Sequence, residues 1–140
     1  MSTAMHVHAM AALLRQARVP AVVSTLLAAT ALGLLLTPPA LPAAACALLS
    51  LLAGAGQAWF AMRIGFDRAL LEGLLQAHPD AAPAPIDDAL HALGLRPAVL
   101  PTRGWPARWQ GMRRLLRGQG ACVLLQAATV LAALWLRAMP

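Results

Sequence analysis

The residues whose chemistry stands out first lie near the start of the chain, where Met-His-Val-His-Ala-Met occupies positions 5–10. Imidazole and thioether groups suit copper, and His6 and His8 could share one ion. The segment precedes an apolar run whose flanks place it on the cytoplasmic side, and that location disfavours copper. We therefore expect residues 1–18 to be an unstructured cytoplasmic tail, with no metal and no other cofactor.

Further potential nitrogen and oxygen ligands lie in the middle of the chain: His78, Asp80, Asp87, Asp88 and His91. A catalytic zinc site uses three protein ligands held on rigid elements. Here Pro83 and Pro85 break the chain between the candidates and form a short, stiff linker. The spacing therefore does not predict a metal site.

Asp67, with Arg63 and Arg68 beside it, is the one carboxylate placed to act on a lipid headgroup. No serine lies in a nucleophile-elbow context, and no glycine-rich phosphate loop follows a strand. We expect a noncatalytic protein, and a lipid-acting membrane enzyme is the weakest of the alternatives considered.

The elements that carry these residues are apolar. Hydrophobic residues make up 60% of the 140 residues, and charged residues only 11%, against about 25% in ordinary globular domains. Residues 19–62 and 118–136 carry no charge, and a helix that spans a membrane needs about 20 apolar residues. The sequence predicts an all-α integral membrane protein with three transmembrane helices.

Prolines divide the first apolar run into a helical hairpin. Pro38, Pro39 and Pro42 fall in its middle, and proline inside a helix removes a backbone donor and clashes with the preceding turn. Unpaired backbone groups are costly in lipid, so the break belongs at an interface. We predict spans over residues 19–36 and 43–62, a turn over residues 37–42, and a third span over residues 118–137.

Arginine sets the predicted orientation. All eleven basic residues are arginine, and ten of them precede the first span or lie between the second and third. Cytoplasmic flanks collect arginine, so the N-terminus is expected inside and the C-terminus outside. The lack of lysine, with abundant alanine and proline, is typical of GC-rich coding and indicates a bacterial inner membrane. A net charge of +6 also suits nucleic acid, but arginines that flank apolar runs favour the membrane.

A cleaved signal peptide is the main alternative for the first span. Arg15 and Arg18 would be its positive region, and the small residues at 43–45 would precede a cut. Signal peptides have apolar cores of about 7–15 residues, which is shorter than the run here. We therefore expect this segment to remain as a span.

Small residues recur every four positions on both helices of the hairpin. Such spacing places them on one helix face, and small faces allow helices in lipid to approach closely. We expect these two faces to pack together. The residues concerned are Ala21, Thr25, Ala29 and Gly33 on the first helix, and Cys46, Ser50, Gly54 and Ala58 on the second.

Few polar residues lie inside the spans, and they fall at similar depths from the cytoplasmic flank: Ser24, Thr25, Gln57 and Gln126. At about 1.5 Å rise per residue these depths are about 9–14 Å. One interpretation is a layer that joins the helices by hydrogen bonds. The other is a polar site or pathway for a headgroup or substrate, and the first is favoured.

The segment over residues 63–117 is predicted to be a cytoplasmic, amphipathic helical insertion. Residues 64–77 should continue the second span as helix, and residues 86–93 should form a short helix that ends at a left-handed Gly94. Tryptophan and arginine then recur in a pattern typical of a helix in the headgroup layer. The expected lipid-interface residues are Trp105, Arg108, Trp109, Arg113, Arg114 and Arg117.

Together these patterns favour a small noncatalytic accessory or scaffold subunit of the inner membrane. Its expected partners are anionic lipid headgroups and another membrane protein, or further copies of itself, rather than nucleic acid. The main alternative is a homo-oligomeric transporter or channel component, in which several copies align the polar residues of the spans around a pore.

Overall fold

The computed structural model describes residues 3–38, 40–77, 84–94 and 104–139. It is 93% helix, and the described ranges contain no strand, which confirms the all-α prediction. The helices are α1 (Thr3–Gln16), α2 (Arg18–Leu36), α3 (Leu41–Ala77), α4 (Ala84–Ala92) and α5 (Trp105–Ala138). Three helical stretches are long and apolar enough to cross a membrane, namely Val7–Leu36, Leu41–Ala77 and Trp105–Ala138. These lengths fit a multi-pass membrane protein.

The hairpin turn follows from the prolines. Helix α2 ends at Leu36, Thr37 is extended, and α3 begins at Leu41. Pro42 lies in the first turn of α3, where a proline removes no hydrogen bond that the helix would otherwise make. Pro39 lies outside the described residues. The connection is therefore only a few residues long, and α2 and α3 must run antiparallel.

The N-terminal segment is not an unstructured tail, because residues 3–16 form α1. Val7, Met10, Ala11 and Leu14 are between 0% and 5% exposed, and their spacing places them on one helix face. Burial of this apolar face stabilises the helix. The helix stops at Gln16 because Pro20 has no N–H to donate to the carbonyl four residues earlier.

Helix α5 also differs from expectation. The sequence predicts a separate helix in the headgroup layer, followed by a span from residue 118, whereas α5 runs without a break from Trp105 to Ala138. Pro106 lies in its first turn, where proline is tolerated. The internal glycines lower helix propensity by about 1 kcal/mol each but leave the backbone hydrogen bonds intact. The tryptophan- and arginine-rich stretch is thus the beginning of the third long helix.

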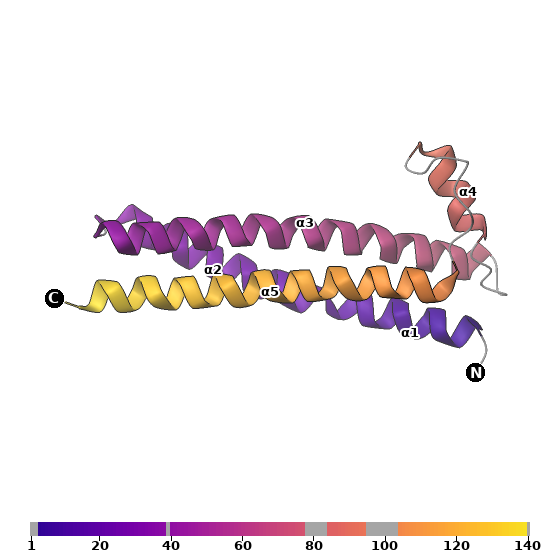
Figure 1. Cartoon of the computed structure of the whole chain (residues 1–140), viewed down its shortest axis with the longest axis horizontal. Coiled ribbons are helices and arrows are strands. Elements are labelled where there is room, and N and C mark those ends of the chain that lie inside the picture. The colour runs from indigo at the N-terminus through magenta and orange to yellow at the C-terminus, as the bar shows by residue number, and fades with distance from the viewer. Residues whose placement is uncertain (1–2, 39, 78–83, 95–103, 140) are drawn as a thin grey trace. The chain divides into compact units, whose positions relative to one another are not determined.

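The chain forms two compact units, and their boundaries lie beside the flanking arginines. Unit 2 comprises Ala17–Arg63 and Leu115–Pro140, and Figure 1 shows α2, α3 and α5 side by side within it. Ala31, Ala47 and Val130, one from each helix, form its apolar core. Leucines cover the outside, including Leu26, Leu52 and Leu124, which are 64%, 69% and 73% exposed.

Unit 2 has the polarity expected for lipid. Gln126 and Ser50 are fully buried and Ser24 is 3% exposed, while the large apolar side chains face outward. A soluble bundle would place leucine inside and glutamine outside. In a bilayer, outward leucine meets lipid, and buried polar groups join the helices. This arrangement supports the membrane assignment independently of helix length.

Unit 1 comprises Met1–Gln16 and Ile64–Arg114. Its core combines the buried face of α1 with Ile64, Leu71 and Leu74 of α3 and Met112 of α5. The short helix α4 ends as the sequence predicts, with Gly94 at φ 67° and its N–H donating to the carbonyl of His91. A left-handed glycine after the last turn is a common helix C-cap.

Candidate functional site

Gln126 is the polar centre of unit 2. The hydroxyl of Ser24 on α2 donates to Gln126 Oε1 at 2.7 Å, and Gln126 Nε2 donates to the Ser24 carbonyl at 3.0 Å. From α3, the Ser50 hydroxyl donates to the Gln126 carbonyl at 3.4 Å. One residue of α5 therefore joins all three helices; of the four polar residues expected to form one layer, Ser24 and Gln126 belong to this group.

Two glycines of unit 2 allow the helices to approach closely. A Cβ at Gly54 would lie 2.8 Å from Gln126 Nε2, and a Cβ at Gly118 would lie 2.7 Å from Phe60 Cζ. Both distances are shorter than real Cβ contacts. Gly54 therefore does lie at a packing contact, but its neighbour is α5 rather than the small face of α2.

The two small-residue faces do not meet within the chain. On α2, Ala21 is half-buried and Thr25, Ala29 and Gly33 are exposed, and none of the atoms that the structure describes lies within 4 Å of a Cβ at Gly33. On α3, Ser50 is buried, Cys46 and Gly54 are half-buried, and Ala58 is exposed.

The hydroxyl groups explain this orientation of α2. Ser24 and Thr25 are consecutive, so they point about 100° apart around the helix and cannot both face inward. Ser24 faces Gln126, whereas Thr25 satisfies its own hydroxyl by donating to the Ala21 carbonyl at 3.0 Å. Such a local bond lets threonine face lipid.

Gln57 is buried separately from the Gln126 group. It is 3% exposed, and its Nε2 has no hydrogen-bond partner in the described part of the chain. A further buried glutamine of unit 2, Gln119, was not predicted from the sequence: it is 1% exposed and donates to the Ala17 carbonyl at 3.1 Å. Its position seven residues before Gln126, on the same helix face, was the available signal.

The contacts within unit 2 define a helix register. Gln119 meets Ala17 and Gln126 meets Ser24, each across 102 residues, so α2 and α5 run parallel. Along α3 the order is reversed, since Gly54 lies near Gln126 and Phe60 near Gly118. Arg117 and Arg137 bracket the apolar part of α5, and 20 residues of helix span about 30 Å, which is the thickness of the hydrocarbon core.

Arg137 closes the far end of unit 2. Its Nη1 donates to the Leu34 carbonyl at 3.3 Å and to the Thr37 hydroxyl. The last carbonyls of a helix lack intrahelical donors and carry partial negative charge, so a cation there is stabilising. The charge of this outlying arginine is therefore partly offset within the chain.

Two exposed tryptophans mark the ends of unit 2 and were not singled out from the sequence. Trp59 lies four residues before Arg63, and Trp135 lies two residues before Arg137; they are 61% and 60% exposed. Tryptophan is enriched at membrane–water interfaces. Their positions just inside a terminal arginine were a signal that could have identified them.

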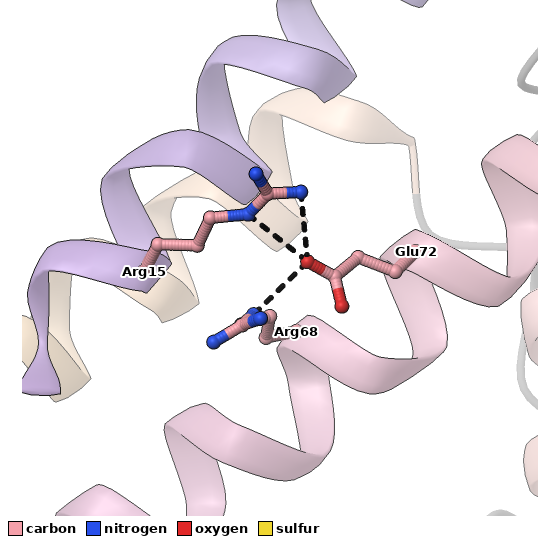
Figure 2. Close-up of polar contacts among 3 residues, drawn as sticks. All are labelled: Arg15, Arg68 and Glu72. Carbon is pink, nitrogen blue, oxygen red and sulfur yellow. Dashed lines mark hydrogen bonds and ion pairs between the residues drawn. The ribbon is translucent and has the colours of Figure 1, made fainter.

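In unit 1, Arg15 of α1 and Arg68 of α3 share one carboxylate oxygen of Glu72 (Figure 2). Arg15 donates through Nε and Nη2, both at 3.1 Å, and Arg68 donates through Nε at 3.0 Å. The hydrogen bond from Arg68, with that from Arg15, holds the pKa of Glu72 below its ordinary value of 4.5. The group ties α1 to α3 and retains one net positive charge.

A second ion pair in unit 1 joins α4 to α5. Arg108 donates to Asp87, and the two side chains are only 11% and 10% exposed. Arg108 is therefore engaged inside unit 1 rather than presented to headgroups. Trp105 and Trp109 are half-buried, whereas Arg113, Arg114 and Arg117 are exposed, and their contact with lipid headgroups stays a prediction.

Asp67 lines a cavity of about 40 Å³ in unit 1, together with Leu70, Leu71, Leu90, Arg108 and Met112. This volume suits one or two water molecules rather than a lipid headgroup. The described residues contain no cluster of three potential metal ligands. At the N-terminus Met10 is buried in the core and His8 is exposed, while the His6 side chain, His78 and Asp80 lie outside the described set.

Comparisons with protein-family models, curated proteins and solved structures find no match to this chain.

Proposed function

We propose that this chain is a small noncatalytic membrane subunit that packs against the helices of a partner membrane protein. The observation that carries the proposal is that the buried polar side chains of unit 2 form hydrogen bonds between its own helices. Ser24 of α2 and Ser50 of α3 are each hydrogen-bonded to Gln126 of α5. Such bonds contribute about 0.6 kcal/mol each on average, and here they hold three helices in one arrangement.

The same observation weighs against a pore formed by several copies. A pore would need Ser24, Gln57 and Gln126 on the outer surface of each copy, but all three are at most 3% exposed within a single chain. Thr25 does face outward, although its hydroxyl is bonded to its own helix. Copies could align these residues around a pathway only by opening the bundle.

The proposed contact surface for the partner is the exposed face of α2 that carries Thr25, Ala29 and Gly33. Small side chains let two helix backbones approach in lipid, and within the described residues no atom lies within 4 Å of a Cβ built at Gly33. We propose a bacterial inner membrane as the location. We also propose that the N-terminus lies inside, because Arg18, Arg63 and Arg117 all flank the same end of unit 2.

Cysteine crosslinking in native membranes tests this proposal. After replacement of Cys46 and Cys122 by alanine, Ala29→Cys should form an adduct with another membrane protein. Thr30→Cys is the matched control, since Thr30 is also exposed but points about 100° away. Adducts from neither position, or equally from both, would contradict the proposal. An adduct of the chain with itself would instead favour the homo-oligomeric alternative.

A further inference from the structure

Three exposed arginines gather at one end of unit 2, one on each of its helices: Arg18 on α2, Arg63 on α3 and Arg117 on α5. The contacts of Gln119 with Ala17 and of Gly118 with Phe60 fix the helix register. In this register Arg18 lies level with Gly120 of α5, and Arg63 lies level with Leu115 of α5. Their depths therefore differ by about five residues, or about 8 Å along the helix axis. They form a narrow belt at the edge of the apolar surface.

The belt arginines differ from Arg15, Arg68, Arg108 and Arg137 in their lack of a partner in the described chain, a property that they share with the exposed Arg113 and Arg114 of unit 1. Among the residues that the structure describes, none of the three guanidinium groups has a hydrogen-bond or ion-pair partner. By contrast, Arg68 is paired with Glu72, Arg108 with Asp87, and Arg137 with the end of α2. The belt therefore carries three positive charges that this part of the chain does not neutralise.

The position of the belt at the edge of the apolar surface, and the exposed Trp59 beside it, favour lipid phosphates as the anions that bind these arginines. Trp59 lies one turn inside Arg63 and is 61% exposed, as expected for a side chain at the headgroup boundary. Phosphate accepts two parallel hydrogen bonds from a guanidinium group. At the edge of the hydrocarbon core, the nearest phosphates are those of the surrounding lipids.

We infer that Arg18, Arg63 and Arg117 bind the phosphate groups of anionic phospholipids and enrich these lipids around the arginine end of unit 2. The inference rests on the membrane placement in the proposed function but not on a protein partner. Each basic residue at an anionic surface should favour anionic over zwitterionic lipid about fivefold, and salt should weaken this preference.

Electron spin resonance of spin-labelled lipids tests the inference on the full chain reconstituted in phosphatidylcholine bilayers. Labelled phosphatidylglycerol should be immobilised by the protein several-fold more strongly than labelled phosphatidylcholine. Combined Arg18→Gln, Arg63→Gln and Arg117→Gln substitutions should bring the two close to equality. The corresponding three lysine substitutions should keep most of the preference, because they keep the charge. If the lysine variant keeps the preference, substitution at these three positions does not by itself prevent folding.

Arg137→Gln is the control at the opposite end, since that charge is already offset by α2, and it should leave the preference unchanged. Equal immobilisation of the two lipids by the native chain would overturn the inference. A lipid preference that added inorganic phosphate abolishes, and that chloride at the same ionic strength does not, would also overturn it, because the three arginines would then bind free phosphate instead of lipid. Absence of immobilised lipid of either kind would instead reject the membrane placement, and with it the proposed function.

Discussion

At the scale of single residues, two of the three buried glutamines of unit 2, Gln126 and Gln57, have opposite energetic roles. Both side-chain amide atoms of Gln126 have a hydrogen-bond partner, since Ser24 bonds to its amide oxygen and to its amide nitrogen. Gln57 is almost as deeply buried, but its Nε2 has no partner in the described chain. A buried unpaired donor costs about 1–3 kcal/mol relative to a paired one, so chemically similar residues should respond differently to the same substitution.

Replacement of each glutamine by leucine tests this difference. Gln126→Leu should destabilise the folded state by about 1–3 kcal/mol, because it removes two hydrogen bonds and leaves the Ser24 groups unpaired in an apolar interior. Gln57→Leu should be neutral or should stabilise it by up to about 1 kcal/mol. Reversible unfolding in mixed micelles, followed by helicity, measures both. Equal losses in the two variants would show that Gln57 has a partner.

Glu72 predicts a response to pH at the contact between α1 and α3. Its pKa is lower in the folded chain than in the unfolded chain, so ionised Glu72 adds stability above pH 4.5. That contribution is lost as the pH falls through the lowered folded value. Amide hydrogen exchange of α1, corrected for intrinsic rates, should therefore accelerate below about pH 4.5. Glu72→Gln should exchange faster at neutral pH and lose this dependence.

At the scale of elements, the apolar spacing within α1 is sufficient to predict a helix, although the segment was expected to be unstructured. Val7, Met10 and Leu14 have the spacing of one helix face, and all are buried in unit 1. The same segment contains two histidines and Met5, whose ligand-like pattern overlaps with the apolar period. Its helical structure was therefore predictable from the sequence.

Adjacent leucines give a matched test of how α1 is held. Leu14 is 2% exposed and Leu13 is 40% exposed. Leu14→Ala should weaken the packing of α1 by about 2–4 kcal/mol, as other core truncations do, and tryptic cleavage at Arg15 should accelerate at least about tenfold. Leu13→Ala should change the cleavage rate little. Similar rates in the two variants would mean that α1 does not pack as described.

The orientation of α2 was not predictable in the same way. Its sequence offers a small face through Thr25 and Ala29 and a polar position at Ser24, and these point in different directions. Which one faces inward depends on Gln126, about one hundred residues later in the chain. A periodicity within one helix contains no information about such a partner, so the packing face followed only from the three-dimensional arrangement.

At the scale of the whole molecule, the boundaries of the two units lie within a few residues of the arginines that flank the apolar runs, although the predicted domain limits themselves stay predictions. The unit boundaries fall at residues 16/17, 63/64 and 114/115, beside the arginines that the sequence marks as flanks. The turn lies at the prolines between α2 and α3. The pairing of Arg108 with Asp87 was not foreseeable, because a positive charge near a span has the same sequence pattern whether it faces lipid or protein.

The proposed orientation is testable at the two termini of the described chain. Met5 and Met139 are both well exposed, at 59% and 50%. In a chain without native cysteines, Met139→Cys should react with a membrane-impermeant thiol reagent in intact spheroplasts. Met5→Cys should react only after the membrane is opened. The reverse pattern would invert the topology, and equal reaction of both would exclude three crossings.

The contact between Arg137 and the end of α2 has a consequence for biosynthesis. In the proposed orientation Arg137 is the one arginine that must be translocated, which costs about 2.3 kcal/mol per 100 mV against an inside-negative potential. Its acceptors, the Leu34 carbonyl and the Thr37 hydroxyl, are on the outer side only after the hairpin has inserted. In this orientation the hairpin, once inserted, supplies the hydrogen-bond acceptors that bind Arg137 when α5 crosses the membrane.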